Sequence, residues 1–364
     1  MIFENIEIVK EAFKKYWQLE NERPLVSVNA YKDKKGYWEY MEFVKNDKRY
    51  KDPFHLKVDP EIKINHQLEI FRHKYFAGET LPILTTAIGP GIGSAFLGSI
   101  VDLRGIDEPT WFHENINDLE NYQVKFDEWN IWWNIQKLIV ECSAKAAREH
   151  GILSEIPVDI FHGIDTLMLL RGSEKLATDL IIYPDKIKSV NAEILKLWKY
   201  WVTELLKIQE PYFEGNSTAW LNLWGPGKTF CLQSDYMTMI STEMYEEFIL
   251  EDVKFMCNQL DHVMFHFDGP DEVVRHLDFL LQIPNLHGIQ WNPETNCENI
   301  RHLPTLKKIQ EAGKCLILNI AANEIETLVK ELSPRGLLLN VDPFDEHYDT
   351  PEEADEIVRK VKSL

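Results

Sequence analysis

From residue 260 onward, short apolar runs alternate with amphipathic segments of helical periodicity. The runs are centred near Met264, Ile289, Ile317 and Leu338, and they recur at intervals of about 21 to 28 residues. An apolar run of strand length followed by a helical segment is typical of a βα unit. Repetition of that unit requires strands that run in parallel, with the helices packed on them. The pattern therefore predicts an α/β fold.

Helix-boundary signals agree with this alternation. Asn323 with Glu326, and Thr350 with Glu353, have the spacing of a capping box. Glycines that would end the preceding helices stand at residues 313 and 336. The second half of the chain is thus predicted to be divided into regular units.

Upstream of residue 260 the same units are longer. The first strand is predicted at residues 82–88, and further strands are predicted at residues 156–161, 220–224 and 230–233. Two long helices are predicted at residues 116–150 and 185–210, the first ended by Gly151 and the second opened by Pro184. Residues 1–78 read as an N-terminal extension of helices and loops.

Parallel alternation fits either a doubly wound sheet or a (β/α)8 TIM barrel. About eight candidate strands lie between residues 80 and 342, and no GxGxxG motif follows any of them. This count favours the barrel. No Pro/Gly/Ser-rich linker interrupts the chain, so residues 1–364 are expected to form a single domain, with the barrel at residues 79–364.

Composition excludes several classes of function. With 39 Lys and Arg against 59 Asp and Glu, the net charge is −20, which disfavours binding to nucleic acid through its phosphates. The five cysteines are scattered and never form CxxC, so neither a disulfide framework nor a cysteine-rich zinc module is expected. No signal peptide or apolar segment of membrane-spanning length is recognised. A cytoplasmic protein that does not bind membranes is therefore expected.

The stretch HVMFHFDG at residues 262–269 places His266 and Asp268 two positions apart at the end of an apolar run. In a strand both side chains lie on one face, roughly 7 Å apart. Active sites of parallel α/β folds lie at the carboxyl ends of the strands. The pair is predicted to be catalytic, either as ligands of a metal such as zinc or as a histidine acid/base oriented by the aspartate. A purely structural pair, or an aspartate that caps the next helix, is the alternative.

Polar residues with the same parity follow other predicted strands. A layer that only packs would hold Val, Ile or Leu, so these polar groups are expected to be hydrogen-bonded or to face a ligand. Asp235 is predicted to be a further catalytic residue. The predicted substrate-binding residues of this set are Gln233, Gln290 and Asn292.

Two aromatic residues and two glycines complete the predicted site. Trp224 and Trp291 stand near strand ends and are expected to wall a pocket for a flat or sugar-like ligand. Gly89 and Gly91, in the segment IGPGIG, would let the backbone approach a ligand closely, although a tight turn explains them equally well.

A series of motifs resembles the uroporphyrinogen decarboxylase superfamily. The motifs are IDTLMLLRGSE at residues 164–174, DLIIYP at 179–184, GPG at 89–91, QSD at 233–235, HFDG at 266–269 and GIQW at 288–291. The resemblance covers residues 80–364 and is closest to divergent bacterial branches. It implies a (β/α)8 barrel, often a homodimer, with the active site at the barrel mouth.

Two chemistries occur in that superfamily. One branch of the superfamily that this chain resembles decarboxylates uroporphyrinogen without a cofactor. It uses an arginine-rich N-terminal segment and a catalytic aspartate. The matching segment RPLVSVNAY, residues 23–31, has Arg23 but none of the arginines expected after it. Losing two or three such clamps on carboxylates would cost several kcal/mol of binding, roughly 1.5–3 kcal/mol for each charged hydrogen bond. Decarboxylation of a porphyrinogen is therefore disfavoured.

The other branch contains zinc-dependent methyltransferases that move a methyl group between a corrinoid protein and an acceptor. Their signature is His-x-Cys, whereas this chain has His266-x-Asp268, and carboxylates change the preference for a metal. The first expectation is a metal-assisted methyltransferase that acts on a small organic substrate, with zinc as cofactor and a corrinoid protein as partner. A decarboxylase (lyase) and a non-catalytic binding protein on a degenerate barrel are the alternatives.

Overall fold

The computed structural model of the chain describes residues 5–105, 108–161, 163–269, 273–293, 298–342 and 348–364. Seven strands form the main sheet, and three further strand pairs stand beside it. The strands of the main sheet are β1 (Leu25–Tyr31), β2 (Lys74–Gly78), β9 (Thr229–Gln233), β10 (His262–Asp268), β11 (Gly288–Asn292), β12 (Cys315–Ile320) and β13 (Leu337–Val341). The pairs are β3 (Ile83–Leu84) with β6 (Leu153–Ser154), β4 (Ile100–Asp102) with β5 (Trp111–His113), and β7 (Gly215–Thr218) with β8 (Leu223–Pro226).

The main sheet has the order β2-β1-β13-β12-β11-β10-β9, and every neighbouring pair except β1 with β2 is parallel. The predicted α/β class with a parallel sheet is therefore confirmed. The closed barrel is not confirmed, because β3 and β6 pair with each other in a separate two-stranded sheet.

The N-terminal 78 residues contribute to this sheet. β1 runs parallel to β13, with Ser27 opposite Asn340 and Val28 opposite Val341. Only helices and loops were predicted before residue 79, and the first strand was predicted at residues 82–88. That placement was wrong, because β1 comes first and β3 has only two residues with strand pairing, Ile83 and Leu84.

The side chain of Asn216, in β7, links the segment after β6 to the start of β9. Asn216 is almost fully buried; its Oδ1 accepts from the backbone N–H of Ile156 at 3.2 Å, and its Nδ2 donates to the carbonyl of Thr229 at 2.9 Å. One side-chain amide thus pairs with one backbone group of the segment after β6 and with one backbone group of β9. We call this the Asn216 bridge.

Replacing Asn216 by alanine is expected to destabilise the protein by about 2–6 kcal/mol. The loss leaves a buried N–H and a buried C=O unpaired, at roughly 1–3 kcal/mol each. Urea unfolding followed by circular dichroism measures the effect. Asn46→Ala, which removes an exposed amide at the end of a helix, is the control and should change stability by less than about 0.5 kcal/mol. Equal stability of the two variants would show that the bridge contributes nothing.

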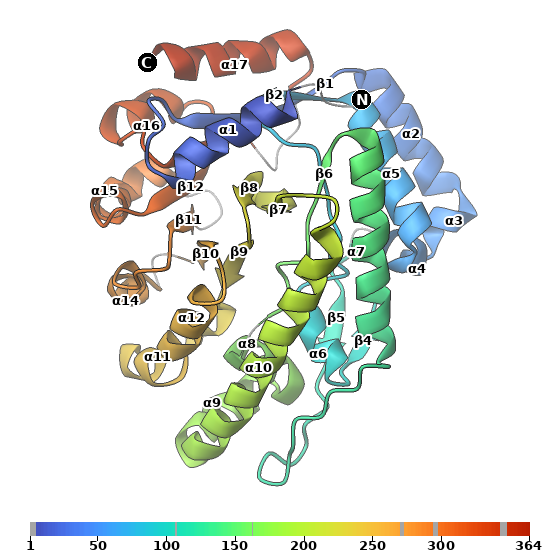
Figure 1. Ribbon diagram of the computed structural model, residues 1–364, viewed down its shortest axis with the longest axis vertical. Helices are drawn as coiled ribbons and strands as arrows, with labels where there is room; N and C mark the ends of the chain where they lie inside the picture. The colour runs from blue at the N-terminus through green and yellow to red at the C-terminus, as the bar shows by residue number, and fades with distance from the viewer. Residues whose placement is uncertain (1–4, 106–107, 162, 270–272, 294–297, 343–347) are drawn as a thin grey trace.

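Helices surround the strands (Figure 1). In the first half of the chain they are α1 (Ile6–Trp17), α2 (Lys34–Asn46), α3 (Lys48–Lys51), α4 (Pro53–Val58), α5 (Pro60–His73), α6 (Ile92–Phe96), α7 (Ile131–His150), α8 (Gly163–Arg171) and α9 (Ser173–Ile182). Those that follow are α10 (Pro184–Gln209), α11 (Thr242–Phe248), α12 (Leu250–Cys257), α14 (Leu277–Leu281), α15 (Leu303–Glu311), α16 (Ile325–Glu331) and α17 (Pro351–Ser363). The short 3₁₀ turns are η1 (Ala219–Leu221), η2 (Asp235–Met239), η3 (Val274–His276) and η4 (Asn299–His302).

The helix predictions are confirmed at some boundaries and wrong at others. α10 begins at Pro184, and the capping box of Thr350 with Glu353 opens α17, as predicted. α7 ends before Gly151 as predicted but begins at residue 131 rather than 116, because Asn130 caps it by accepting from two backbone N–H groups. The capping box predicted at Asn323 is absent, since α16 begins two residues later without a side-chain cap.

A continuous apolar core lies between the sheet and its helices. Its largest fully buried side chains include Trp133, Trp198 and Trp201, and the rings of Phe96 and Trp201 meet edge to face at 5.1 Å. Within the described residues, no helix has the length and apolar character to cross a bilayer.

Candidate active site

A cavity of about 610 Å³ opens where several parallel strands end. Its walls come from the segments after β3 and β6, from the ends of β9 and β10, and from η1. It is lined by Thr85, Ala87, Pro90, Glu155, Val158, Asp159, Ala219, Trp220, Gln233 and His266. We call it the acidic cavity. Its position at the carboxyl ends of strands is where parallel α/β folds bind ligands.

His266 is oriented by its neighbour in the sheet. His266 and Gln290 are partners in the register of β10 and β11, so their side chains share a face. Nδ1 of the histidine is hydrogen-bonded to Oε1 of Gln290, while Nε2 of Gln290 donates to the Trp291 carbonyl at 3.4 Å. Because an amide oxygen only accepts, Nδ1 carries the ring proton and Nε2 holds the lone pair of the neutral ring. The arrangement suits a base.

Glu155 is the most deeply buried acid of the cavity, with 2% of its surface exposed. It accepts from the Thr85 hydroxyl at 2.6 Å, from the backbone N–H of Ala219 at 2.6 Å and from that of Thr86 at 3.4 Å. These bonds favour the ionised form, but burial outweighs them and raises the pKa of Glu155 to about 7. Near neutral pH this carboxyl can therefore either donate or accept a proton.

Asp159 lies on the same wall. Burial is the main cause that raises the pKa of Asp159 to about 6, with a further rise from the charge of Asp235 and an opposing effect from Lys63. The Lys63 ammonium is buried and donates to the Ala87 carbonyl at 2.8 Å. Burial lowers the pKa of Lys63 to about 8, and the nearby charges of Glu155 and Asp159 oppose that change. Two acids of the cavity and one buried amine behind its wall thus have pKa values between about 6 and 8.

Asp235 is the first residue of η2, two residues after Gln233, and is not among the residues that line the cavity. Although its side chain is accessible to solvent, the surrounding protein raises the pKa of Asp235; the charge of His266 lowers it, and that of Asp268 raises it. The buried Asp165 accepts from the backbone N–H groups of Asp235 and Tyr236, at 3.1 and 2.9 Å. Burial, then the charge of Asp235, holds the pKa of Asp165 well above its usual value. Asp165 therefore positions the turn that carries Asp235.

Asp268 and Asn292 form a second polar pair one step beyond His266 and Gln290. They are register partners at the ends of β10 and β11, and Asn292 Nδ2 donates to Asp268 Oδ1 at 2.5 Å. Asp268 is exposed and does not line the acidic cavity. The residue that orients His266 is thus Gln290 rather than Asp268.

The predicted zinc site does not fit the described residues. Among them, no group of three histidine, cysteine, aspartate or glutamate side chains could hold a metal ion. His266 and Asp268 supply two donors, and protein zinc sites use about three or four side-chain ligands.

Neither of the two tryptophans that were predicted to form the walls of the pocket lines the cavity. Trp291 is fully buried and stacks on Phe267 at 5.4 Å, on the face of the sheet opposite to Gln290, because successive residues of a strand point in opposite directions. The Trp224 carbonyl accepts from the Trp17 indole, and the Lys10 ammonium lies 5.7 Å from the Trp224 ring, so Trp224 faces α1. The aromatic wall is instead Trp220 of η1, whose ring meets His266 edge to face at 4.8 Å.

The two glycines of the GPG segment are explained by packing. A Cβ atom at Gly89 would lie 2.4 Å from Cβ of Thr110. Gly91 has a φ of +94°, and a Cβ there would lie 2.1 Å from Leu169. Between them Pro90 lines the cavity. The glycines therefore let this segment fold closely enough to form the wall.

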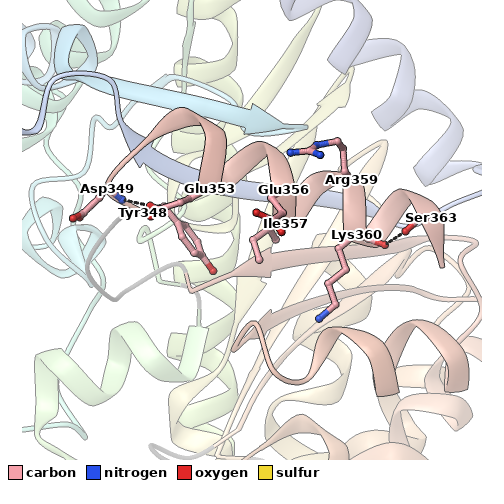
Figure 2. Close-up of a pocket in the computed structure, with 8 residues that line it drawn as sticks. All are labelled: Tyr348, Asp349, Glu353, Glu356, Ile357, Arg359, Lys360 and Ser363. Atoms are coloured by element: carbon pink, nitrogen blue, oxygen red, sulfur yellow. Dashed lines mark hydrogen bonds between the residues drawn. The ribbon is translucent and has the colours of Figure 1, made fainter.

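A larger hollow of about 950 Å³ runs along α17, but its polar groups do not converge (Figure 2). Arg359 and Lys360 point to opposite sides of the helix there. Glu353 is engaged in the capping box, and the Ser363 hydroxyl donates to the carbonyl of Lys360. The hollow lacks the buried titratable groups of the acidic cavity, which makes the acidic cavity the better candidate for an active site.

Comparison with known proteins identifies a shared fold. No protein-family model matches the chain, and no curated protein matches it in sequence. Among solved structures, the chain is similar to a methyltransferase from Methanosarcina mazei, with a TM-score of 0.61 and 12% sequence identity over 98% of both chains. The likeness therefore extends over nearly the whole chain in fold.

Proposed function

We propose that the protein is an enzyme of the methyl-transfer type that works by acid–base catalysis in the acidic cavity. The observation that carries the proposal is the buried Glu155, with a pKa of about 7, in the same cavity as His266, whose Nδ1 is engaged by Gln290 so that Nε2 carries the lone pair. Groups that titrate near neutral pH are the most effective proton donors and acceptors in catalysis. The methyltransferase of similar fold supports the reaction type.

The chemistry needs one base and one acid. Nε2 of His266 would take the proton of an acceptor group, such as a thiol, as that group attacks the methyl carbon. The bond from the methyl carbon to its donor breaks, and the leaving group keeps the electron pair. Protonated Glu155 can supply a proton to a leaving group that departs as a base, such as an alkoxide, and Asp159 can relay it; a corrinoid leaving group keeps the electron pair and needs no proton. No step is assigned to a metal, since the described residues do not fit one.

A small organic acceptor and a methylated corrinoid, free or carried on a protein, are the proposed substrates. The walls of the acidic cavity suit a compact acceptor, with Trp220 as the flat surface and Gln233 as the polar group at the end of β9. The corrinoid follows from the resemblance to corrinoid methyltransferases. The homodimer and the cytoplasmic location stay predictions.

The test is methyl transfer from methylcobalamin to a panel of small thiols, followed by the loss of methylcobalamin absorbance and by mass spectrometry of the S-methyl product. The wild type is expected to produce the thioether, and His266→Ala to lower the rate about 100-fold or more. The control is His113→Ala, which removes an exposed histidine of β5 and should leave the rate unchanged. Equal rates in wild type and His266→Ala, or no transfer by the wild type, would overturn the proposal.

Porphyrinogen decarboxylation receives no support from the one arginine in the matching segment. Arg23 precedes β1, at the end of the strand remote from the cavity, and pairs with the buried Glu79 at 2.6 Å. Its charge is therefore engaged and is not placed to hold a substrate carboxylate. Incubation with uroporphyrinogen is the direct comparison, and conversion there, without methyl transfer, would favour the decarboxylase.

A further inference from the structure

A second, smaller cavity adjoins the acidic cavity. Its volume is about 200 Å³, and Ala219 and Trp220 belong to the walls of both. Strands β1, β2, β3 and β13 supply most of the remainder. The lining residues are Ser27, Asn29, Phe71, Lys74, Phe76, Thr80, Leu81, Ile83, Ala219, Trp220, Asn222, Asn340 and Val341. We call it the lysine cavity, because Lys74 is the one charged residue among the described residues that line it.

The lysine cavity holds a cation without a counter-charge. Lys74 is half-buried, and within the described part of the chain its ammonium has no carboxylate within salt-bridge distance. Burial alone lowers the pKa of Lys74 to about 8, so the ammonium is still mostly charged at neutral pH. A desolvated ammonium without a partner is costly, and an anion placed beside it would recover part of that cost.

Two further polar atoms of the walls are buried and have no hydrogen-bond partner among the described residues. Asn340 is 3% exposed, and its Nδ2 donates to the Leu221 carbonyl and to Asn319 Oδ1, both at 3.2 Å. With the nitrogen thus engaged, Asn340 Oδ1 remains as an acceptor without a donor. The Trp220 indole N–H is likewise a buried donor without an acceptor. Unpaired buried groups cost roughly 1–3 kcal/mol each unless a ligand or water satisfies them.

We propose that the lysine cavity binds the carboxylate end of the substrate, with Lys74 and the Trp220 indole as donors and Asn340 Oδ1 as the acceptor for a hydroxyl or amino group on the adjacent carbon. The ligand class is therefore a small 2-hydroxy or 2-amino acid. A volume of about 200 Å³ corresponds to roughly six or seven water molecules at about 30 Å³ each, which admits such an end group and excludes a macrocycle.

This inference rests on the proposed function, because the substrate whose carboxylate binds at Lys74 would extend past Trp220 into the acidic cavity. Because Trp220 forms a wall of both cavities and contacts His266, a carboxylate held at Lys74 would place the rest of the molecule beside the catalytic groups. Lys74 would thus determine which substrates are accepted, while His266 and Glu155 carry the proton transfers.

Isothermal titration calorimetry with sodium lactate tests the site directly and needs no turnover. The wild type is expected to bind lactate with a millimolar Kd, and Lys74→Gln to weaken binding at least tenfold. Lys74→Arg keeps the charge and should retain binding within about threefold, which also excludes a general folding defect. Lys45→Gln, which removes an exposed lysine of α2, is the matched control and should bind as the wild type does.

Propionate, which lacks the hydroxyl, should bind at least threefold more weakly than lactate to the wild type. Equal lactate affinity in wild type and Lys74→Gln, or no lactate binding by the wild type at tens of millimolar, would overturn the inference. Glu155→Gln separates this result from the proposed function, because with a donor whose leaving group must be protonated it should lower turnover about 100-fold or more, and it should change lactate affinity by no more than about threefold. Lactate binding that depends on Lys74, in a protein without methyl transfer, would keep the carboxylate site and reject only the reaction.

Discussion

Replacing Glu155 by glutamine is expected to lower the rate of methyl transfer, from a donor whose leaving group must be protonated, by about 100- to 10,000-fold. The amide keeps the size of the side chain and can still accept from the Ala219 N–H, but it cannot donate an acidic proton. In the wild type the protonated acid is lost as the pH rises through about 7. The rate should therefore fall on the alkaline side of pH 7, and this limb should disappear in Glu155→Gln.

A control and a pH profile distinguish this catalytic role from a structural one. Glu61→Gln removes an exposed carboxyl of α5 and should leave both the rate and the profile unchanged. If Glu155 only anchors η1, Glu155→Gln would keep the alkaline limb and lose stability instead. Mass spectrometry of the S-methyl product between pH 5 and 9, with a donor whose leaving group must be protonated in place of methylcobalamin, makes the measurement.

Replacing Asp252 by asparagine is expected to change the pH dependence of stability. The free energy of unfolding of Asp252→Asn, minus that of the wild type, should be about 2–3 kcal/mol larger at pH 8 than at pH 5. Burial raises the pKa of Asp252 to about 7, although Asn191 donates to it at 2.6 Å. The unfolded carboxyl has a pKa near 4, so the folded state binds the proton more tightly. The stabilisation that comes from this tighter proton binding is present at low pH. It is lost as the pH rises through about 7, at about 1.4 kcal/mol per pH unit.

Urea unfolding at pH 5 and pH 8 checks this sign. Glu251→Gln, which removes the exposed carboxyl next to Asp252 in α12, is the control and should show little dependence on pH relative to the wild type. A difference between Asp252→Asn and the wild type that is the same at both pH values would mean that Asp252 is ionised in the folded protein throughout this range.

The fold was predictable from the sequence where strands are long enough to give a periodic signal. The strands β10 to β13 lie where the apolar runs predicted them. β3 and β6 have two residues each with strand pairing, and the apolar run at residues 156–161 continues past β6 into a loop that lines the cavity. Apolar runs alone cannot show where pairing stops, because burial in a loop selects the same residues.

Site residues were predictable where alternation along a strand holds. Gln233, His266 and Gln290 share the inward face as the parity of β9 to β11 predicted. Gln290 and Trp291 could not both face the cavity, since they are adjacent in one strand. Near Trp224 alternation fails, because η1 and the left-handed Asn222 (φ 51°) break the strand.

Glu155 was missed although one signal was available. An acid within the apolar stretch that begins at Ile152 must be buried, and burial of a carboxyl is costly enough to require a purpose. Lys63 gave no such signal, because it lies in the polar pattern of α5 and reaches the cavity wall only through the packing of that helix.

The anchoring of η1 to Glu155 links the two cavities energetically. The carboxyl oxygen that accepts from the Ala219 N–H holds the start of the turn that carries Trp220. A hydrogen bond to an ionised carboxylate is about twice as strong as one to a neutral group. Ionisation of Glu155 therefore strengthens the hydrogen bond that fixes the turn with Trp220, the residue that lies between the acidic cavity and Lys74. By thermodynamic reciprocity, a ligand that holds Trp220 in place must favour the ionised form of Glu155. Binding in the lysine cavity should therefore lower the pKa of Glu155 in the acidic cavity.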